Sequence, residues 1–195
     1  MQILKYFDPP KLDDRLLKVA NITAVREVSI KPFEGALPLN CLNNSNAYTR
    51  VNGGDVQLGW ILSILGNVAL KLTAHAVVKN KGGSLICVTP NPYRKNKLRF
   101  VPDPTVAKLI QNNHLPVRFI PLTQNETLNE FLEIEREMDR IRLQNSGLVD
   151  NMEFQMMKVR QLALYPAVLE LARKHTTPNQ YCYCGSNKKR NKCCG

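Results

Sequence analysis

Three apolar runs decide the fold: VQLGWILSIL (residues 56–65), VALKLTAHAVVK (68–79) and SLICVT (84–89). Only the short turns Gly66-Asn67 and Lys81-Gly82-Gly83 separate them. Apolar runs rich in β-branched residues and joined by glycine turns are typical of neighbouring strands that pair antiparallel. The segment therefore predicts an antiparallel sheet built as a meander.

A helix is expected immediately before this sheet. Upstream, residues 11–20 predict a short helix, and the alternating segment 22–30 predicts a strand. The segment LNCLNNSNAYTRV (39–51) then predicts a helix that begins at Cys41, with Asn40 as its N-cap residue. A helix followed by an antiparallel sheet indicates an α+β core.

A further helix is expected after residue 123. Thr123-x-x-Glu126 and Thr127-x-x-Glu130 both match the capping box that starts a helix. Apolar residues follow at alternating spacings of three and four, which predicts one buried helix face. They are Phe131, Ile134, Met138 and Ile141.

The next helix is expected from about Asp150 to about Lys174, with Pro166 as a kink or a new start. It carries a second apolar stripe, consisting of Met152, Met156, Val159 and Ala163. We expect both stripes to be packing surfaces, against each other or against the core. The two helices then form a hairpin.

Charge and cysteines are concentrated at the C-terminus. The chain carries 27 Lys and Arg against 16 Asp and Glu, a formal net charge of +11. The last 23 residues hold six basic residues and no acidic one. No apolar run approaches the ~20 residues of a membrane helix, and the first residues lack a signal-peptide core, so we expect a cytoplasmic protein. The basic tail suits an acidic partner.

The final segment reads CYCGSNKKRNKCCG (182–195) and supplies four closely spaced cysteines: Cys182, Cys184, Cys193 and Cys194. Four thiolates in one short segment are the ligand set of a tetrahedral structural zinc ion. A segment of this length cannot bury its own core, so metal binding must supply its folding free energy. The alternatives are two disulfides, which a cytoplasmic setting disfavours, or four free thiols, which leave the spacing unexplained. We expect zinc.

The tail resembles the SEC-C motif, a zinc-binding tail best known at the C-terminus of the bacterial preprotein translocase motor. There, Cys-x-Cys-Gly-Ser-Gly-Lys-Lys is followed by a short basic run and then Cys-Cys or Cys-His. All four ligand positions are present here, whereas Asn187 replaces the second glycine. The resemblance covers less than a tenth of the chain. Because the motif docks protein partners or ribosomes in that family, it implies a binding module rather than a reaction.

The basic residues between the cysteine pairs are Lys188, Lys189, Arg190 and Lys192. Beside RNA, they are expected to contact phosphates, with binding that weakens steeply as salt rises. Tyr181 and Tyr183 are candidates for stacking on exposed bases. The alternative is that the basic side chains are simply solvated and the tyrosines pack on the metal loop.

A second constellation lies in the N-terminal part. Cys41 is expected at a helix N-terminus, where the helix dipole favours a thiolate. His75 is expected on a strand, from which its imidazole can take the thiol proton. This order, a cysteine on a helix and then a histidine on a strand, resembles papain-like and transglutaminase-like cysteine enzymes. The resemblance implies that Cys41 is the nucleophile and His75 the base.

One residue departs from that pattern. Cys87 stands where such sequences carry an aspartate that orients the histidine, and a thiol is a poor substitute. Asn91 or Thr89 is the expected replacement, since an asparagine orients the histidine in papain-like enzymes. The alternatives are that Cys41 is a small buried apolar residue and His75 a core residue, or that Cys41, His75 and Cys87 form a second metal site.

The sequence thus predicts an α+β protein in three parts: a papain-like or transglutaminase-like core (1–123), a helical hairpin (124–174), and a linker with a zinc hook (175–195). Two functions fit these parts. The first is a zinc-binding adaptor whose basic tail docks a protein or ribonucleoprotein partner. The second is a cysteine-dependent hydrolase or acyl transferase, peptidase-like, that uses Cys41 and His75 and is brought to its target by the tail.

Overall fold

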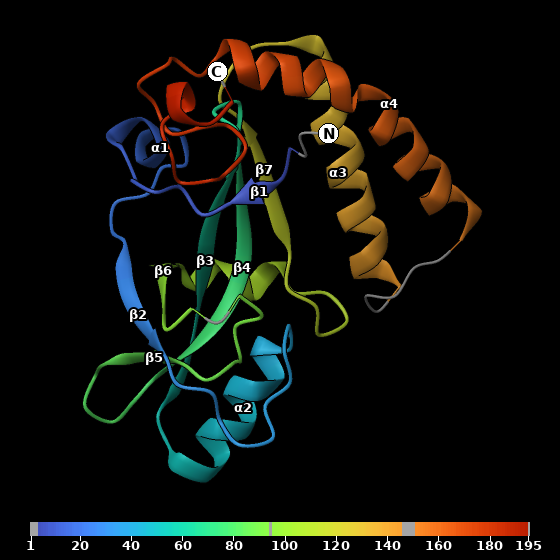
Figure 1. Cartoon of the computed structure of the whole chain (residues 1–195). Coiled ribbons are helices and arrows are strands. Elements are labelled where there is room, and N and C mark those ends of the chain that lie inside the picture. Colours follow the sequence, from blue (N-terminus) through green and yellow to red (C-terminus); the bar gives the residue numbers. More distant parts are fainter. Residues whose placement is uncertain (1–3, 94, 146–150, 195) are drawn as a thin grey trace. The chain divides into compact units, whose positions relative to one another are not determined.

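The computed structural model describes residues 4–93, 95–145 and 151–194. It confirms an α+β protein that contains a sheet and several helices (Figure 1). Residue contacts divide the chain into two units, which we name the ring unit (22–61 with 73–116) and the hook unit (1–21, 62–72 and 117–195). These units combine distant stretches of sequence. Their boundaries therefore differ from those of the three parts expected from the sequence. The division into three parts stays a prediction.

Five strands of the sheet close on themselves. They are β2 (Arg26–Ile30), β3 (Asp55–Leu65), β4 (Ala69–Lys79), β5 (Leu85–Cys87) and β6 (Lys97–Pro102). β3 pairs with β4 and β4 with β5, as the meander predicts. The closure was not expected: β6 pairs antiparallel with both β3 and β2, and β2 pairs in parallel with β5.

One part of the core of the ring unit is an apolar cluster. Val28, Val77, Phe100 and Cys87 are buried together in it. Gly59 allows β3 to approach β6, because a Cβ atom there would lie 2.1 Å from the carbonyl oxygen of Val101 and 2.6 Å from the Phe100 ring. A glycine is therefore required at this point of the ring.

Helix α2 (Cys41–Asn52) begins at Cys41, as expected. Asn40 occupies the N-cap position, but its side-chain oxygen accepts a hydrogen bond from the Asn43 amide at 2.8 Å instead of capping the backbone. The side chain of Asn44 connects this helix to neighbouring segments by hydrogen bonds. Its amide donates to the Leu37 carbonyl at 2.7 Å and to the Thr89 hydroxyl at 3.1 Å. Asn44 thereby fastens the start of α2 to the segment that follows β5. The short helix η1 (Pro104–Leu109) completes the ring unit.

The hook unit combines both ends of the sequence with the middle. Its own elements are β1 (Tyr6–Phe7), α1 (Asp14–Val19), β7 (Val117–Pro121), α3 (Glu126–Gln144), α4 (Met152–Lys174) and the short helix η2 (Arg190–Lys192). β1 pairs antiparallel with the end of β3, and β7 lies next to β4. One apolar cluster joins β7, α3, α4 and the cysteine segment to the end of β3, and it includes Leu65, Leu128, Leu132, Val168 and Tyr183.

Helix α3 forms where it was expected, but a different residue caps its N-terminus. The side chain of Asn125 accepts the Leu128 backbone N–H at 3.0 Å and so caps the helix. Neither capping box predicted at Thr123 or Thr127 is used. The expected stripe faces the core, since Phe131, Ile134 and Ile141 are buried.

Helix α4 is continuous across Pro166, and the Asn151 side chain caps it by accepting the Phe154 N–H at 2.9 Å. Residue 150, the expected start, lies outside the described residues. The prediction that the α4 stripe is a packing surface is wrong. Met152, Met156 and Val159 are 80%, 66% and 68% exposed.

The rotation of α4 explains this exposure. Val168 and Ala172 in its C-terminal half are buried in the core of the hook unit. Gln161 lies seven and eleven residues before them, which places it on the same side of the helix. It faces α3 and donates to Glu135 at 2.9 Å. The stripe lies on the opposite side. No helix within the described ranges is both long and apolar enough to cross a membrane.

Candidate functional site

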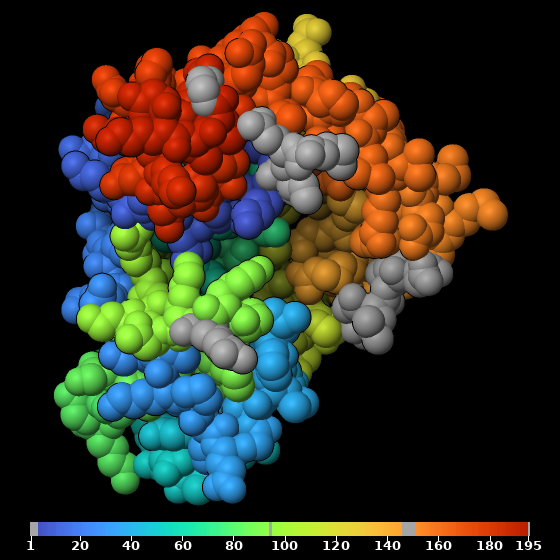
Figure 2. Space-filling view, viewed as in Figure 1, coloured from blue at the N-terminus to red at the C-terminus, as the bar shows by residue number. Residues whose placement is uncertain are grey.

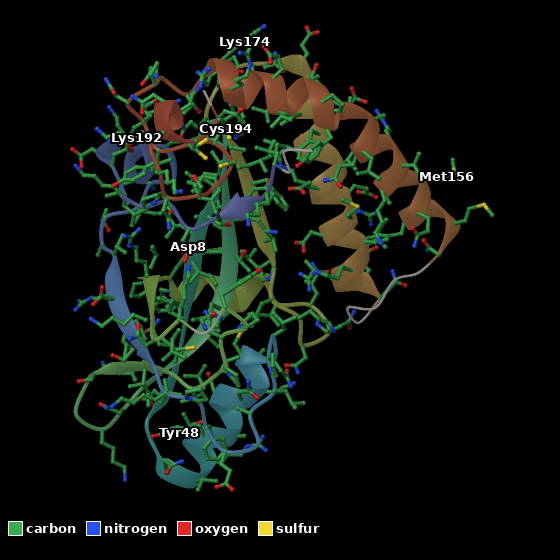
Figure 3. The ribbon with its side chains drawn as sticks, viewed as in Figure 1. Asp8, Tyr48, Met156, Lys174, Lys192 and Cys194 are labelled. Carbon is green, nitrogen blue, oxygen red and sulfur yellow. The ribbon has the colours of Figure 1, made fainter. Side chains whose placement is uncertain are left out.

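The four C-terminal cysteines form one cluster. Their sulfur atoms all lie within 4.8 Å of one another, and Cys193 is 3.5 Å from Cys184 and 3.8 Å from Cys194, sulfur to sulfur. Figure 3 shows sulfur atoms gathered at Cys194. Four soft ligands at such separations can hold a metal ion. The prediction of a metal-binding cluster is supported at this level, and the identity of the metal remains a prediction.

Backbone geometry brings the two cysteine pairs together. The Cys182 N–H donates to the Lys188 carbonyl at 2.8 Å, and the N–H groups of Cys193 and Cys194 both donate to the Arg190 carbonyl at 3.0 Å. The turn between the pairs needs left-handed backbone at Gly185 (φ +75°) and Asn187 (φ +59°). Asparagine adopts this conformation more readily than other residues with a side chain. This explains why an asparagine fits at position 187.

The close approach of the thiols makes their protonation unequal. Burial raises the pKa of Cys184, but hydrogen bonds from Ser186 and the neighbouring thiols outweigh it and bring that pKa down to about 7. Burial and the hydrogen bonds of the same cluster raise the pKa of Cys194. Cys184 is therefore the first of the two to offer a thiolate.

The cysteine cluster is anchored in the core of the hook unit. Cys182 is fully buried and Tyr183 is 1% exposed. Tyr183 therefore cannot stack on a base. The segment turns at this point, since the Gly185 N–H donates to the Cys182 carbonyl at 3.1 Å, and both Cys182 and Tyr183 pack into the apolar cluster of the hook unit. Nothing in the local sequence pattern indicated that Tyr183 is buried while Tyr181 is exposed.

The segment 175–180, expected as a linker, is also tied to the core. Thr176 is fully buried, and its hydroxyl donates to the Ala172 carbonyl at 2.8 Å. The same hydroxyl accepts the Asn67 amide at 2.9 Å. The hook therefore leaves α4 through a hydrogen-bonded turn and not through an open tether.

Arg190 has a structural role that the sequence did not indicate. Its Nη1 atom donates to the carbonyl oxygens of Arg173 at 2.9 Å and Thr176 at 2.5 Å. The guanidinium thus satisfies carbonyl groups at and just beyond the C-terminus of α4. The exposed basic residues that remain on the hook are Lys188, Lys189 and Lys192, which we name the hook lysines. Figure 3 shows Lys192 pointing away from the sulfur atoms.

The structure brings Cys41, His75 and Cys87 to one place in the ring unit. His75 Nε2 lies 3.2 Å from the Cys87 sulfur, and the backbone of Ala76 is hydrogen-bonded to the Cys41 thiol.

The side chain of Asn91 is used in a local turn, since its oxygen accepts the Tyr93 N–H at 2.8 Å. Among the described residues, only the hook cysteines form a group that could hold a metal ion. A second metal site at Cys41, His75 and Cys87 is therefore not supported.

Burial keeps the Cys41 neighbourhood uncharged at neutral pH. It raises the pKa of the Cys41 thiol to about 11 and lowers the pKa of His75 to about 4. Burial also raises the pKa of Cys87. A thiolate–imidazolium pair needs the opposite shifts. In this conformation the three side chains are neutral: His75 and Cys87 are hydrogen-bonded to each other, whereas the Cys41 thiol is hydrogen-bonded to backbone, and Cys87 belongs to the apolar core.

No protein-family model, curated protein or solved structure matches the chain. The fold and the site define an α+β protein with a closed five-stranded sheet and a C-terminal cysteine cluster able to hold a metal ion.

Proposed function

We propose that the chain is a zinc-dependent adaptor, in which the four-cysteine hook holds one zinc ion and presents the hook lysines to an acidic protein or ribonucleoprotein partner. The single observation that carries the proposal is the convergence of four sulfur atoms within 4.8 Å. A closed set of four protein ligands suits a structural ion, because a catalytic ion needs an open position.

The spacing of the sulfur atoms suits zinc. Tetrahedral zinc with Zn–S bonds of about 2.3 Å requires sulfur atoms about 3.8 Å apart. The separations of 3.5 and 3.8 Å from Cys193 are close to this value. Together with the resemblance of the tail to the SEC-C motif, this favours zinc.

The surface of the hook supports an acidic partner. The hook lysines are all exposed, whereas Arg190 is used to hold the end of α4. No acidic residue follows Glu170 in the sequence. Exposed ammonium groups on one short segment attract phosphate or carboxylate groups, and exposed charges of this kind act mainly on partner choice and association rate.

The adaptor hypothesis predicts that charge on the hook controls binding. A variant in which the hook lysines are changed to glutamate should bind purified ribosomes at least about tenfold more weakly than the parent at low salt. Co-sedimentation of the zinc-loaded full chain measures this. Pull-down from a lysate extends the comparison to protein partners. Raising the salt concentration should weaken the parent more than the variant.

A matched control carries the same charge change on the ring unit. It reverses three other exposed lysines: Lys31, Lys79 and Lys108. Equal losses in the two variants would mean that net charge alone drives binding, and unchanged partners in the hook variant would reject the adaptor. Reversing surface charges is preferable to deleting residues 176–195, because the deletion also removes Tyr183 from the core.

A cysteine-dependent hydrolase or acyl transferase is the second candidate. It is supported by the start of α2 at Cys41 and by the hydrogen bond that the Ala76 backbone, next to His75, makes to the Cys41 thiol. In this hypothesis the papain-like or transglutaminase-like ring unit supplies Cys41 as nucleophile and His75 as base, while Asn91 must leave Tyr93 to orient the imidazole. A substrate would have to bring polar groups into the site to reverse the pKa shifts that burial causes.

Thiol reactivity separates the two candidates. Because the pKa of Cys41 is raised to about 11, its thiolate fraction at pH 8 is at least about 100-fold below that of a free cysteine. Iodoacetamide should therefore modify Cys41 at least about 100-fold more slowly at pH 8, and the rate should keep rising as the pH approaches 11. Peptide mass spectrometry of the folded, zinc-loaded chain follows Cys41 separately from the hook cysteines. Rapid modification at pH 7 that His75→Ala abolishes would instead favour the hydrolase.

A further inference from the structure

The stripe of α4 is an exposed apolar feature on the surface of the hook unit. Met152, Met156 and Val159 are 80%, 66% and 68% exposed, and Leu162 beside them is 66% exposed. Ala163 continues the stripe. Figure 3 shows the Met156 side chain extending away from the ribbon, and Figure 2 shows the N-terminal half of α4 at the surface. Contiguous apolar patches of this kind mark interaction sites.

We propose that this stripe binds the same stripe of a second copy of the chain, with the two α4 helices antiparallel. The residues Met152, Met156, Val159 and Ala163 follow one another at spacings of four, three and four. This is the spacing with which one helix packs lengthwise along another. The proposal is independent of the metal and of the function of the hook.

The sizes of the side chains fit an antiparallel pair. A twofold axis between Met156 and Val159 places Met156 of one copy opposite Val159 of the other. It also places Met152 opposite Ala163. Each layer of the contact then combines a larger side chain with a smaller one, which keeps the distance between the helices even. Two parallel helices would instead stack Met152 on Met152 and Met156 on Met156.

The charges beside the stripe also fit an antiparallel pair. Glu153 and Arg160 lie on the same edge of the stripe, and both are exposed. In the antiparallel pair, Glu153 of each copy faces Arg160 of the other, so the attraction occurs twice. In a parallel pair, residues seven apart are separated by about 10 Å along the axis and do not meet.

Arg160 remains available for this contact. It pairs with Glu130 of its own chain at 2.6 Å, but its side chain is still 65% exposed. The stripe covers only the N-terminal half of α4, so the interface belongs to the small class that buries less than about 1,200 Å² in total. A reversible dimer of micromolar affinity is therefore expected.

Sedimentation equilibrium of the zinc-loaded full chain, with a reductant to prevent disulfide cross-links, tests the proposal. The parent should dimerise with a dissociation constant in the micromolar range. Val159→Glu should raise that constant at least about tenfold, because it places like charges in the contact. Val51→Glu is the matched control, since Val51 is 74% exposed on α2. A parent that stays monomeric up to about 1 mM, or equal effects of the two variants, overturns the proposal.

Charge reversal tests the antiparallel arrangement. Glu153→Arg alone and Arg160→Glu alone should each weaken dimerisation about three- to tenfold, because each replaces two attractions by two repulsions. The double variant should return to within about threefold of the parent. Thermal unfolding confirms that each variant is folded. If the double variant dimerises no more tightly than the two folded single variants, the antiparallel pairing of the two copies is ruled out.

Discussion

Removing zinc from the hook is expected to lower the midpoint of thermal unfolding by about 10 °C. Zinc at about 1,000 times its dissociation constant stabilises the folded chain by about 4 kcal/mol. For a protein of about 200 residues, 1 kcal/mol corresponds to about 2–4 °C. The effect should reach the whole hook unit, because Cys182 and Tyr183 belong to its core. Calorimetry of the zinc-loaded and chelator-treated chain measures the shift, and metal analysis should find about one zinc per chain.

Two variants make this result specific to the hook. Cys194→Ser removes one ligand of the cluster and should abolish the zinc-dependent shift. Cys41→Ser changes a buried cysteine that lies outside the cluster, and it should leave the shift intact even if the midpoint itself falls. A zinc-free chain that unfolds at the same temperature as the zinc-loaded one would contradict the assignment.

Tyr183→Ala is expected to lower the free energy of unfolding by about 3–5 kcal/mol, as for other large side chains removed from a core. Tyr183 is 1% exposed and packs in the same cluster as Leu65, Val168 and Ala172. Losing its ring opens a cavity between the metal site and the sheet. Denaturant unfolding of the zinc-loaded chain measures the loss.

Tyr181→Ala is the matched control, two residues away and 47% exposed. It should cost less than about 1 kcal/mol, since surface substitutions usually have small effects. Tyr183→Phe retains the ring and separates its contribution from that of the hydroxyl. If the alanine variants at 181 and 183 behaved alike, the hook would be an appendage of the core and not a part of it.

The helices and strands of the chain were predictable where the local sequence pattern determines them. Apolar runs and glycine turns predicted β3 and β4, and the spacing of apolar residues predicted α3. The closure of the sheet was not predictable, because the parallel pairing of β2 with β5 joins segments about 57 residues apart, as Ser29 and Ile86 illustrate. No local pattern in the sequence marks such a pairing.

Side-chain direction was harder to predict than element type. The α4 stripe has a regular helical spacing, but its direction is fixed by Val168 and Ala172, which lie further along the helix and outside the stripe. Likewise, the basic run of the tail gave no sign that Arg190 bonds the carbonyls at the end of α4 while its lysine neighbours stay in solvent. Spacing alone correctly predicted the four cysteines that come together.

The hook unit also constrains the order in which the chain can fold during synthesis. One apolar cluster contains both Leu4 and Tyr183, which are far apart in the sequence, and the Tyr165 hydroxyl donates to the Leu4 carbonyl. The ring unit needs no residue beyond 116, so it can close while later residues are still being translated. The apolar cluster of the hook unit, by contrast, is complete only once Tyr183 has been synthesised. Metal binding at the cysteine cluster would then be the step that completes it.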